Sequence, residues 1–415
     1  MKTNPEMTAD PVNSTHDVAA AWGGRSAFAI VDLDALAANI GAIRDCVGAD
    51  VQVMAVVKGN GYGHGAVPIA RTAIDAGAAA LGVATVDEGA QLRRAGIETP
   101  ILVFGAVGRH ERHQAIGHRL GLVVTNEAFA RALAADAASS LAKELVPVHV
   151  KIDTGMRRFG ATPADVPGLV RTIASLEKLR LDGVMTHLAC ADAEDPAMVT
   201  EQVAIFDRCL AELERAGLPV PTQHLANSAA TLRFPAFHRN VVRVGIAMYG
   251  LVPDASIPLP APMRPVLTVH GRVVRVFDLS PQDLVGYGGT YRSAGDERAA
   301  LVPIGYADGY RRGLSSQGWM SLQGQRAEVI GRVSMDQTVV RVPAGLTIEA
   351  GEQVVIAGDG TPATGVAPTL DDLAALAGTI GYEMATGLAL RLPKLYVRDG
   401  KLVAIADLHG YRELM

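Results

Sequence analysis

The sequence has few cysteines, no excess of positive charge and no long apolar run. Its 415 residues contain three cysteines (Cys46, Cys190 and Cys209), which do not have the spacing of metal ligands. Such cysteine usage is typical of a reducing compartment, so we expect buried free thiols, a cytoplasmic protein and no metal site. The net charge of −5 and the scattered arginines argue against a nucleic-acid partner, which needs a basic face.

No apolar run approaches the ~20 residues that cross a bilayer as a helix, so we expect no membrane partner. Residues 1–25 are polar, carry acidic side chains and lack the apolar core of a secretory signal peptide. We therefore expect these residues to form a flexible N-terminal extension. The whole chain, with 49% hydrophobic and 20% charged residues, has the composition of a globular protein.

Eight short, β-branched apolar segments follow one another in the first part of the chain, and amphipathic segments separate most of them. One of these, residues 195–217, has four apolar residues on one face at helical spacing: Val203, Phe206, Leu210 and Leu213. This repeated alternation predicts an α/β fold with an N-terminal (β/α)8 TIM barrel. We expect its strands within residues 51–57, 80–85, 100–105, 121–125, 146–153, 181–187, 222–226 and 241–248.

The pattern changes after residues 251–265, which contain five prolines. Apolar and polar residues then alternate, as they do in half-buried antiparallel strands. We place a domain boundary near residue 262 and predict a barrel over residues 26–262, followed by a mostly β C-terminal domain over residues 263–415. Residues 27–33 are a further strand candidate, which either precedes the barrel or pairs elsewhere.

Polar residues gather at the carboxyl ends of the predicted strands, where a TIM barrel carries its chemistry. Lys58 ends the first strand, and four alternating glycines follow it in residues 59–65. Each position alone has an ordinary explanation, such as a solvated lysine at the barrel rim, a structural histidine or a tight turn. Their combination indicates a site, and the other candidates are Lys151 and Arg158 after the fifth strand, His187 at the end of the sixth, Asn227 and Ser228 after the seventh, and Arg243 and Gly245 on the eighth.

The last two strands of such a barrel commonly hold a phosphate group. Ser228 offers a hydroxyl there, and Gly245 lets backbone N–H groups approach an anion closely. A lysine on another strand of the same barrel indicates pyridoxal phosphate as the cofactor. Its aldehyde would bond to Lys58, and its phosphate would lie at Ser228 and Gly245.

The motifs resemble those of the fold-type III pyridoxal phosphate enzymes, and specifically those of the alanine racemase family. They occur in the family's order from about residue 27 to residue 405, which is nearly all of the chain. The matching segments are VVKGNGYGHG (56–65), KIDTGMRRFG (151–160), VMTHLACAD (184–192), HLANSAA (224–230), VVRVGIAMYG (241–250), YGGTY (287–291), PIGYADGY (303–310) and GRVSMDQ (331–337).

The resemblance implies pyridoxal 5'-phosphate as the cofactor and Lys58 as the lysine that bonds to its aldehyde. Arg243 would face the pyridine nitrogen, and His187 would lie against the ring. Lys151 matches a position that is carbamylated in many members of the family. The full set of implied cofactor contacts is Lys58, Tyr62, His187, Asn227, Ser228, Arg243, Gly245 and Ile246, and the implied substrate contacts are Arg158, Tyr291 and Met335.

The resemblance also implies interconversion of L-alanine and D-alanine, which supplies D-alanine for peptidoglycan, in a homodimer with shared active sites. Racemisation removes the Cα proton on one face and returns a proton on the other, so it needs two bases. Lys58 would serve one face and Tyr306 of the partner subunit the other, with both pKa values lowered from about 10. The guanidinium of Arg243 cannot give up a proton, so it would leave the pyridine nitrogen unprotonated and limit transamination.

Three alternatives stay open at this point: a racemase of serine or another amino acid, a basic amino-acid decarboxylase, and a non-catalytic pyridoxal phosphate-binding protein. A decarboxylase would usually place an acid where Arg243 stands, and a carrier protein resembles the barrel alone. The chain also departs from the family pattern. Gly59 and Gly61 replace commoner alanines, which predicts a more mobile loop, and Leu390 stands where some members have a phosphate-binding tyrosine.

Overall fold

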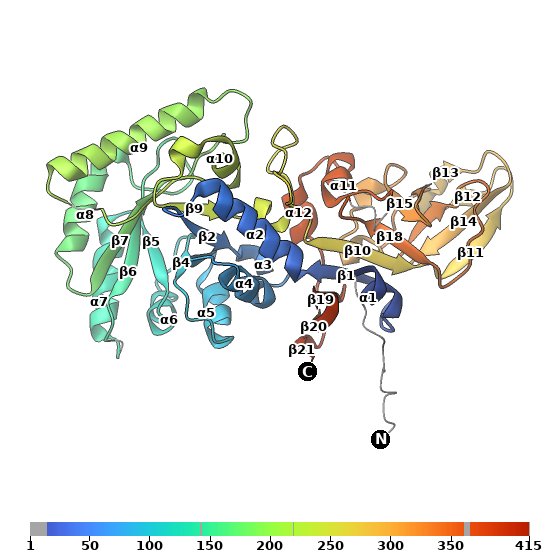
Figure 1. The fold of residues 1–415 in the computed structure, drawn as a ribbon, viewed down its shortest axis with the longest axis horizontal. Helices are drawn as coiled ribbons and strands as arrows, with labels where there is room; N and C mark the ends of the chain where they lie inside the picture. Colours follow the sequence, from blue (N-terminus) through green and yellow to red (C-terminus); the bar gives the residue numbers. More distant parts are fainter. Residues whose placement is uncertain (1–14, 142, 219, 361–365, 415) are drawn as a thin grey trace, which may run out of the picture. The chain divides into compact units, whose positions relative to one another are not determined.

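The computed structural model describes residues 15–141, 143–218, 220–360 and 366–414. Leu36–Met263 forms one compact unit, and the described residues of Met1–Ala35 and Arg264–Met415 together form a second. The barrel strands β2–β9 in Figure 1 belong to the first unit, and the remaining strands, β1 and β10–β21, belong to the second.

The first unit is built on eight parallel strands that form a barrel (Figure 1), which confirms the predicted fold class. The strand order is β8-β7-β6-β5-β4-β3-β2-β9. Hydrogen bonds from Asn240 N to Gln223 O (3.2 Å) and from Arg243 N to Ala226 O (2.9 Å) join the two ends of the sheet. The strands are β2 (Gln52–Val56), β3 (Ala80–Val83), β4 (Ile101–Val103), β5 (Gly121–Val124), β6 (Val146–Lys151), β7 (Leu179–Met185), β8 (Gln223–His224) and β9 (Val241–Val244).

Helices cover the outside of this barrel (Figure 1). The 19-residue helix α9 buries Val203, Phe206 and Leu213, as its sequence pattern predicted. The fourth residue of the predicted face, Leu210, is only half-buried. Because parallel strands are covered on both faces, they read as nearly continuous apolar runs, and this is why the sequence located all eight. The helices are α2 (Leu33–Val47), α4 (Ala66–Asp75), α5 (Val86–Arg94), α6 (Arg112–Gly117), α7 (Glu127–Ser139), α8 (Val166–Ala174), α9 (Ala197–Arg215) and α10 (Ser228–Arg233).

The second unit contains an eight-stranded sheet with the order β16-β15-β18-β10-β1-β19-β20-β21, a three-stranded sheet β11-β14-β17 and the pair β12-β13. Its strands are mostly antiparallel, as the alternating pattern predicted. Two short helices, α11 (Leu370–Leu376) and α12 (Gly381–Thr386), belong to this unit. The strands beyond β9 are β10 (Leu267–Arg272), β11 (Arg275–Leu279), β12 (Leu284–Val285), β13 (Tyr291–Arg292), β14 (Glu297–Val302), β15 (Trp319–Leu322), β16 (Gln325–Glu328), β17 (Thr338–Arg341), β18 (Gln353–Ala357), β19 (Lys394–Arg398), β20 (Lys401–Asp407) and β21 (Gly410–Glu413).

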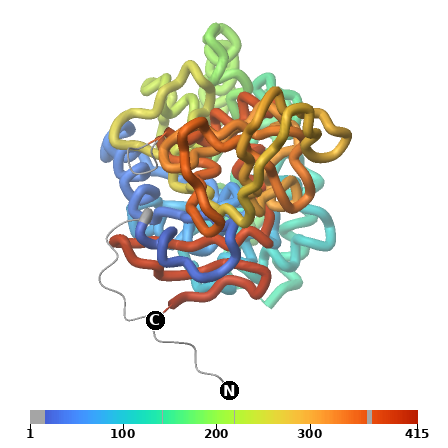
Figure 2. The backbone as a smooth tube through the Cα atoms, turned by 90° about the vertical axis from the view of Figure 1, so that its right-hand side faces the viewer, coloured from blue at the N-terminus to red at the C-terminus, as the bar shows by residue number. Residues whose placement is uncertain are grey.

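The strand β1 (Ala27–Asp32) lies in this second sheet and not in the barrel. It pairs antiparallel with β10 and parallel with β19, and Figure 2 shows its blue trace beside the red C-terminal strands. The sequence left open whether residues 27–33 precede the barrel or pair elsewhere. In the structure they pair with strands outside the barrel. Residues 26–35, which we had assigned to the barrel, therefore belong to the other unit.

Part of the predicted flexible extension has regular structure. Residues 15–21 form the helix α1 (Thr15–Ala21), which packs Val18 and Ala19 against Phe28 and Ile30 of β1. The first 14 residues of the predicted extension lie outside the described residues. Val18 and Ala19 give this seven-residue helix a face to bury, and so short an apolar stretch did not predict a helix.

The expectation of three buried thiols is correct for Cys209 alone. Cys46 is exposed near the end of α2, and Cys190 is half-buried. Cys46 is the second-last residue of α2, and Cys190 lies in the loop between β7 and α9, so neither position forces a cysteine into the core. Among the described residues, no helix is both long enough and apolar enough to span a bilayer.

Candidate active site

Arg243 lies inside the barrel on β9, with only 4% of its surface exposed. Its Nη2 donates hydrogen bonds to Thr186 O (2.8 Å) and Leu225 O (3.2 Å). Burial lowers the pKa of Arg243 to about 10, which leaves the guanidinium charged near neutral pH. Within the described chain no carboxylate forms an ion pair with it, so neutral acceptors alone hold this buried charge.

His187, which follows β7, is one of these acceptors. Arg243 Nη2 lies 3.3 Å from His187 Nδ1, and a guanidinium can only donate, so Nδ1 accepts and Nε2 carries the ring proton. Burial, and after it the charge of Arg243, keeps the pKa of His187 well below its usual range. The structure therefore brings a neutral imidazole and a cationic guanidinium together.

Two lysines at the carboxyl ends of barrel strands have lowered pKa values. Burial, and then the charge of Arg158, lowers the pKa of Lys58, although its side chain keeps contact with solvent. Lys151 is only 7% exposed, and burial followed by the charges of Arg158 and Arg243 lowers its pKa to about 8. Its Nζ lies 5.3 Å from the ring centroid of Phe159. Both amines are thus easier to deprotonate than an ordinary lysine.

The chain leaves Lys58 through one turn of left-handed helix, labelled α3 (Lys58–Tyr62) in Figure 1. Gly59, Asn60 and Gly61 have φ values of 62°, 55° and 63°. Gly61 N donates to Val57 O (2.8 Å) and Gly63 N to Gly59 O (2.9 Å). This conformation costs about 1–2 kcal/mol per ordinary residue, and glycine avoids most of that cost. The loop that we expected to be mobile is a hydrogen-bonded turn.

The left-handed turn places Tyr62 beside Gly245. The Tyr62 ring stacks on that of Tyr249 with centroids 4.9 Å apart. A Cβ at Gly245 would lie 2.5 Å from the Tyr62 hydroxyl oxygen, so only glycine fits at this position. Burial raises the pKa of Tyr62, and the phenol therefore stays protonated.

Ser228 lies at the same end of the barrel and faces the backbone of the last strand. Its hydroxyl oxygen accepts from Gly245 N (3.0 Å) and Ala247 N (3.4 Å), which leaves the hydroxyl proton to donate. Asn227 is the N-cap of α10: its Oδ1 accepts from Ala230 N (3.0 Å). A short 3₁₀ helix begins at the buried Ile246, so two helix amino ends, which favour negative charge, meet near Ser228.

The remaining predicted site residues lie in the second unit. Tyr306 and Met335 are neighbours there, because Tyr306 N donates to Ser334 O and Ala307 N to Met335 O, both at 3.0 Å. They are exposed, at 42% and 52% respectively. Tyr291, on β13, donates its hydroxyl proton to Glu297 Oε2 (2.5 Å). Within that unit Tyr306 and Met335 are thus adjacent and accessible, while Tyr291 is engaged elsewhere.

Sequence reasoning missed Glu88, which connects α5 to the left-handed turn. Its Oε1 accepts from Gly59 N (2.7 Å), and its Oε2 accepts from Ala84 N (2.7 Å) and Thr85 N (3.2 Å). Its charge also acts on Lys58, raising the pKa against the effect of burial. A signal was present in the sequence, since Thr85 and Glu88 have the spacing of a capping box.

Gln202 is a second residue that the sequence did not indicate. It is 1% exposed, and its Nε2 donates to His187 O (3.1 Å) and Thr154 Oγ1 (3.2 Å). Its Oε1 accepts from Ala189 N (2.8 Å). Gln202 therefore ties the segments after β6 and β7 together from helix α9, and no local pattern distinguishes it from other polar residues of that helix.

Two family models match this chain over most of its length. The alanine racemase N-terminal domain matches residues 31–253, and the alanine racemase C-terminal domain matches residues 266–396. The alanine racemase of Symbiobacterium thermophilum is 41% identical over 374 residues, which are 90% of this chain and 98% of that relative. The alanine racemase of a Nostoc species is 38% identical over 379 residues, or 91% of this chain and 97% of the relative.

Solved structures of alanine racemases share the fold. The Bacillus anthracis structure has a TM-score of 0.86 at 35% identity, covering 93% of this chain and 99% of its own. The Streptomyces coelicolor A3(2) structure has a TM-score of 0.85 at 37% identity, covering 90% of this chain and 98% of its own. The resemblance seen in the motifs is confirmed over both units: the chain belongs to the alanine racemase family.

Proposed function

We propose that this chain interconverts L-alanine and D-alanine with pyridoxal phosphate as cofactor, and so supplies D-alanine for peptidoglycan. The observation that carries the proposal is Arg243, a buried guanidinium held by neutral acceptors alone, with a lysine of lowered pKa at the end of a neighbouring strand. The Bacillus anthracis relative, whose structure contains bound L-Ala-P, supports alanine as the substrate.

The residues of the barrel fit pyridoxal phosphate. Ser228 keeps a hydroxyl proton to donate. The Tyr62 hydroxyl lies so close to Gly245 that a side chain at residue 245 would not fit. These groups and the two helix amino ends nearby would hold the phosphate. Arg243 would donate to the pyridine nitrogen, and Lys58 would hold the aldehyde.

When bound, the cofactor supplies an electron sink that makes the Cα proton of an attached amino acid acidic. The chain's part is to place bases and charges around that carbon. Arg243 remains protonated and therefore offers no proton acceptor to the pyridine nitrogen. The pyridine nitrogen would then stay neutral. The cofactor would take up less of the negative charge formed at Cα, which disfavours transamination.

Proton transfer at Cα requires one base on each face. We propose Lys58 for one face and the partner subunit's Tyr306 for the other. Burial and the charge of Arg158 lower the pKa of Lys58, which increases the unprotonated fraction that can accept a proton. Tyr306 is exposed within its own unit and therefore accessible to a second copy of the chain.

We propose that Leu36–Met263 binds the cofactor and that the second unit of a partner copy completes the site with Tyr306 and Met335. The arrangement is then a homodimer with shared active sites. Arg158 would bind the substrate carboxylate, since it is exposed and its charge acts on both Lys58 and Lys151. A carbamate on Lys151 would replace a buried cation with an anion and so orient Arg158.

The test is incubation of L-alanine with the purified protein and pyridoxal phosphate in heavy water, followed by chiral separation and mass analysis. We expect D-alanine that carries deuterium at Cα. L-serine and L-lysine assayed in parallel distinguish a serine racemase or a basic amino-acid decarboxylase. A yellow, folded protein that leaves every amino acid unchanged would contradict the proposal and indicate a cofactor-binding protein without turnover.

A further inference from the structure

A chain of hydrogen bonds leads from Arg243 away from the candidate active site, toward the amino ends of the barrel strands. Arg243 Nη1 lies 3.4 Å from His224 Nδ1, a long contact, and His224 Nε2 lies 2.9 Å from His149 Nδ1. The two imidazole rings are perpendicular, with centroids 4.9 Å apart. None of the roles proposed above uses either of these histidines.

The direction of each hydrogen bond follows from Arg243. Because a guanidinium has donors only, His224 Nδ1 accepts, and the proton of the neutral ring sits on Nε2. That Nε2–H donates to His149 Nδ1, so His149 in turn carries its own proton on Nε2. Burial holds the pKa of His224 well below its usual range and lowers that of His149 to about 4, so both rings are neutral near pH 7.

The backbone makes room for the His149 ring at one particular place. Val148 pairs with Leu181, but the next residue, His149, pairs with Gly183, so Asp182 is the extra residue of a β-bulge. A Cβ on Gly183 would lie 2.8 Å from His149 Nδ1. The same Cβ would lie 2.7 Å from the backbone Thr222 O, so the neighbouring backbone and the His149 ring both require glycine here. With no side chain at Gly183, the His149 ring reaches His224 across this strand.

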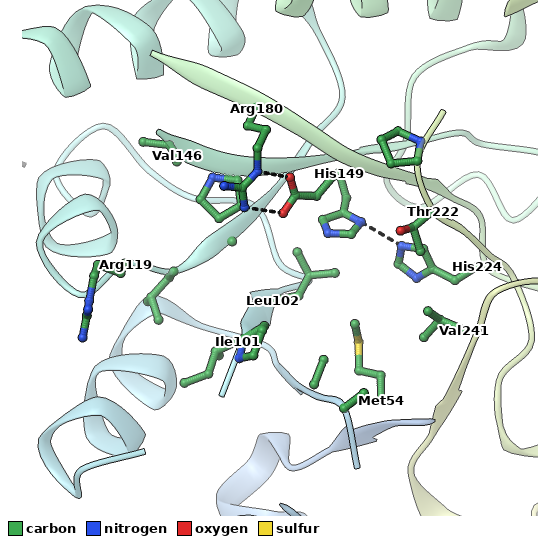
Figure 3. Close-up of a pocket in the computed structure, with 18 of the residues that line it drawn as sticks. Met54, Ile101, Leu102, Arg119, Val146, His149, Arg180, Thr222, His224 and Val241 are labelled. Carbon is green, nitrogen blue, oxygen red and sulfur yellow. Dashed lines mark hydrogen bonds and ion pairs between the residues drawn. The ribbon is translucent and has the colours of Figure 1, made fainter. Parts of the chain in front are cut away.

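The hydrogen-bond chain ends at His149, which lines a cavity of about 560 Å³ at the amino ends of the strands (Figure 3). Figure 3 shows His149 between its partner His224 and the side chain of Arg180. Arg180 forms two hydrogen bonds with Asp182, at 2.5 Å and 2.8 Å. His149 Nε2 makes no hydrogen bond to another described residue, and His149 is one of the residues that line this cavity.

We infer that His149 is a positioning residue for Arg243, acting through His224. The inference rests on the proposed function, because that function gives Arg243 its task at the pyridine nitrogen. Without the acceptor on His149, the buried Nε2–H of His224 would be unpaired, which is a costly state. His224 would then rotate toward another partner and release Arg243 Nη1. The guanidinium would keep its three contacts at Nη2 and lose the one that fixes Nη1.

The first test measures the ring tautomers in the wild-type apoprotein by long-range ¹H–¹⁵N correlation of labelled histidines, assigned with His149→Asn and His224→Asn. We expect both His224 and His149 to carry their proton on Nε2. A proton on Nδ1 of His224 would overturn the inference, because Arg243 then has no acceptor there. This measurement needs neither the cofactor nor activity, so it is independent of the proposed function.

The second test compares His149→Asn with His149→Leu in the protein loaded with pyridoxal phosphate. Asparagine Oδ1 replaces the Nδ1 acceptor, and leucine removes it. For His149→Leu we expect a shifted visible absorption band of the bound cofactor and a kcat lower by about tenfold with little change in KM. For His149→Asn we expect the wild-type band and a kcat within about twofold of the wild type.

Equal behaviour of the two variants, in band position and in kcat, would overturn the inference whatever their melting temperatures, since a purely structural role predicts no difference in the spectrum. If the wild-type protein neither binds the cofactor nor turns over alanine, the proposed function fails. In that case the tautomer measurement still decides whether the hydrogen-bond chain exists. The same measurement decides if His149→Leu does not fold.

Discussion

The carboxylate of Glu88 accepts a hydrogen bond from Gly59 N at 2.7 Å, and so connects the first turn of helix α5 to the residue after Lys58. The same carboxylate acts on the pKa of Lys58, which burial lowers and Glu88 raises. Glu88 therefore has two effects: it holds the left-handed turn in place, and it limits how far burial lowers the pKa of Lys58.

Replacing Glu88 by glutamine should lower the pKa of Lys58 further, because the opposing negative charge is lost. The unprotonated amine is the nucleophile, so the rate at which the apoprotein takes up pyridoxal phosphate should reach its plateau at a lower pH than in the wild type. Stopped-flow absorbance across a pH series measures this. The matched control is Asp87→Asn. Asp87 is the preceding residue, and its carboxylate accepts a hydrogen bond from Gln114 Nε2 (2.9 Å) and none from the turn after Lys58. A shift to higher pH, or the same shift in both variants, would refute this role.

Lys58→Ala should abolish the visible band of the bound cofactor and lower kcat/KM by about 10²–10⁴-fold or more, because both the covalent attachment and one base are lost. Absorbance after dialysis and the racemisation assay measure the two effects. Lys143→Ala removes an exposed lysine of a loop and should leave both unchanged. A Lys58→Ala protein that keeps the band would mean that another amine holds the aldehyde.

Tyr306→Phe should keep the cofactor band and lose about 10²–10⁴-fold in racemisation, since the phenol would be the second base. Mixing this variant with Lys58→Ala also tests whether active sites are shared. In a mixed dimer, one site would combine an intact Lys58 with an intact Tyr306. Half of the dimers would be mixed, so about a quarter of the wild-type activity should return. No recovery after subunits have exchanged would place Lys58 and Tyr306 in the same subunit's site.

Gly61→Ala should destabilise the protein by about 1–2 kcal/mol, because Gly61 has a φ of 63° and a Cβ there would lie 3.3 Å from the Ala66 backbone. Urea unfolding of the apoprotein measures the change. Gly41→Ala provides the opposite control: Gly41 lies inside helix α2 with space around it, so alanine should stabilise by about 0.5–1 kcal/mol. Equal effects of the two substitutions would show that the turn tolerates alanine without strain.

Lys151 should react with carbon dioxide at a lower pH than an ordinary lysine does. Its pKa of about 8 leaves roughly one amine in ten unprotonated at pH 7, against fewer than one in a thousand for the usual value near 10.4. Burial disfavours the charged form, so the reactive fraction rises with pH through about 8. A carbamate signal in ¹³C spectra with labelled bicarbonate, lost in Lys151→Gln, is the expected result. A signal of equal size in both proteins would assign the carbamate to another lysine.

The barrel could be predicted from the sequence because each of its strands is a short, nearly continuous apolar run, and parallel strands covered on both faces must read in this way. The pairing of β1 could not be predicted, since its partners β10 and β19 lie more than two hundred residues away and nothing in residues 27–33 identifies them. The helix α1 was missed because it is only seven residues long, and its buried residues Val18 and Ala19 pack against residues of β1 and β19 that lie elsewhere in the chain.

The candidate site was predictable where a residue type occurs at the end of a strand, as with Lys58, Lys151 and Arg243. It was not predictable where a residue acts from another element. Glu88 and Gln202 reach the site from helices α5 and α9, and their role depends on which backbone groups those helices face. The pair His149–His224 depends on a bulge and on Gly183, which become visible only when the register of two strands is known.

By itself the sequence determined the order of the barrel strands, the residue types at their ends and, through its motifs, the family. All of these can be read from residues that are close in the sequence: the strands from the spacing of apolar residues, and the family from short motifs. Only the tertiary structure decided which acceptors hold Arg243, that the glycines after Lys58 form a left-handed turn, and that two histidines extend from the guanidinium to a cavity. The acceptors of Arg243 and the histidine pair require distant segments to come within 3–4 Å of each other. The turn depends on positive φ values, which glycine allows but does not impose.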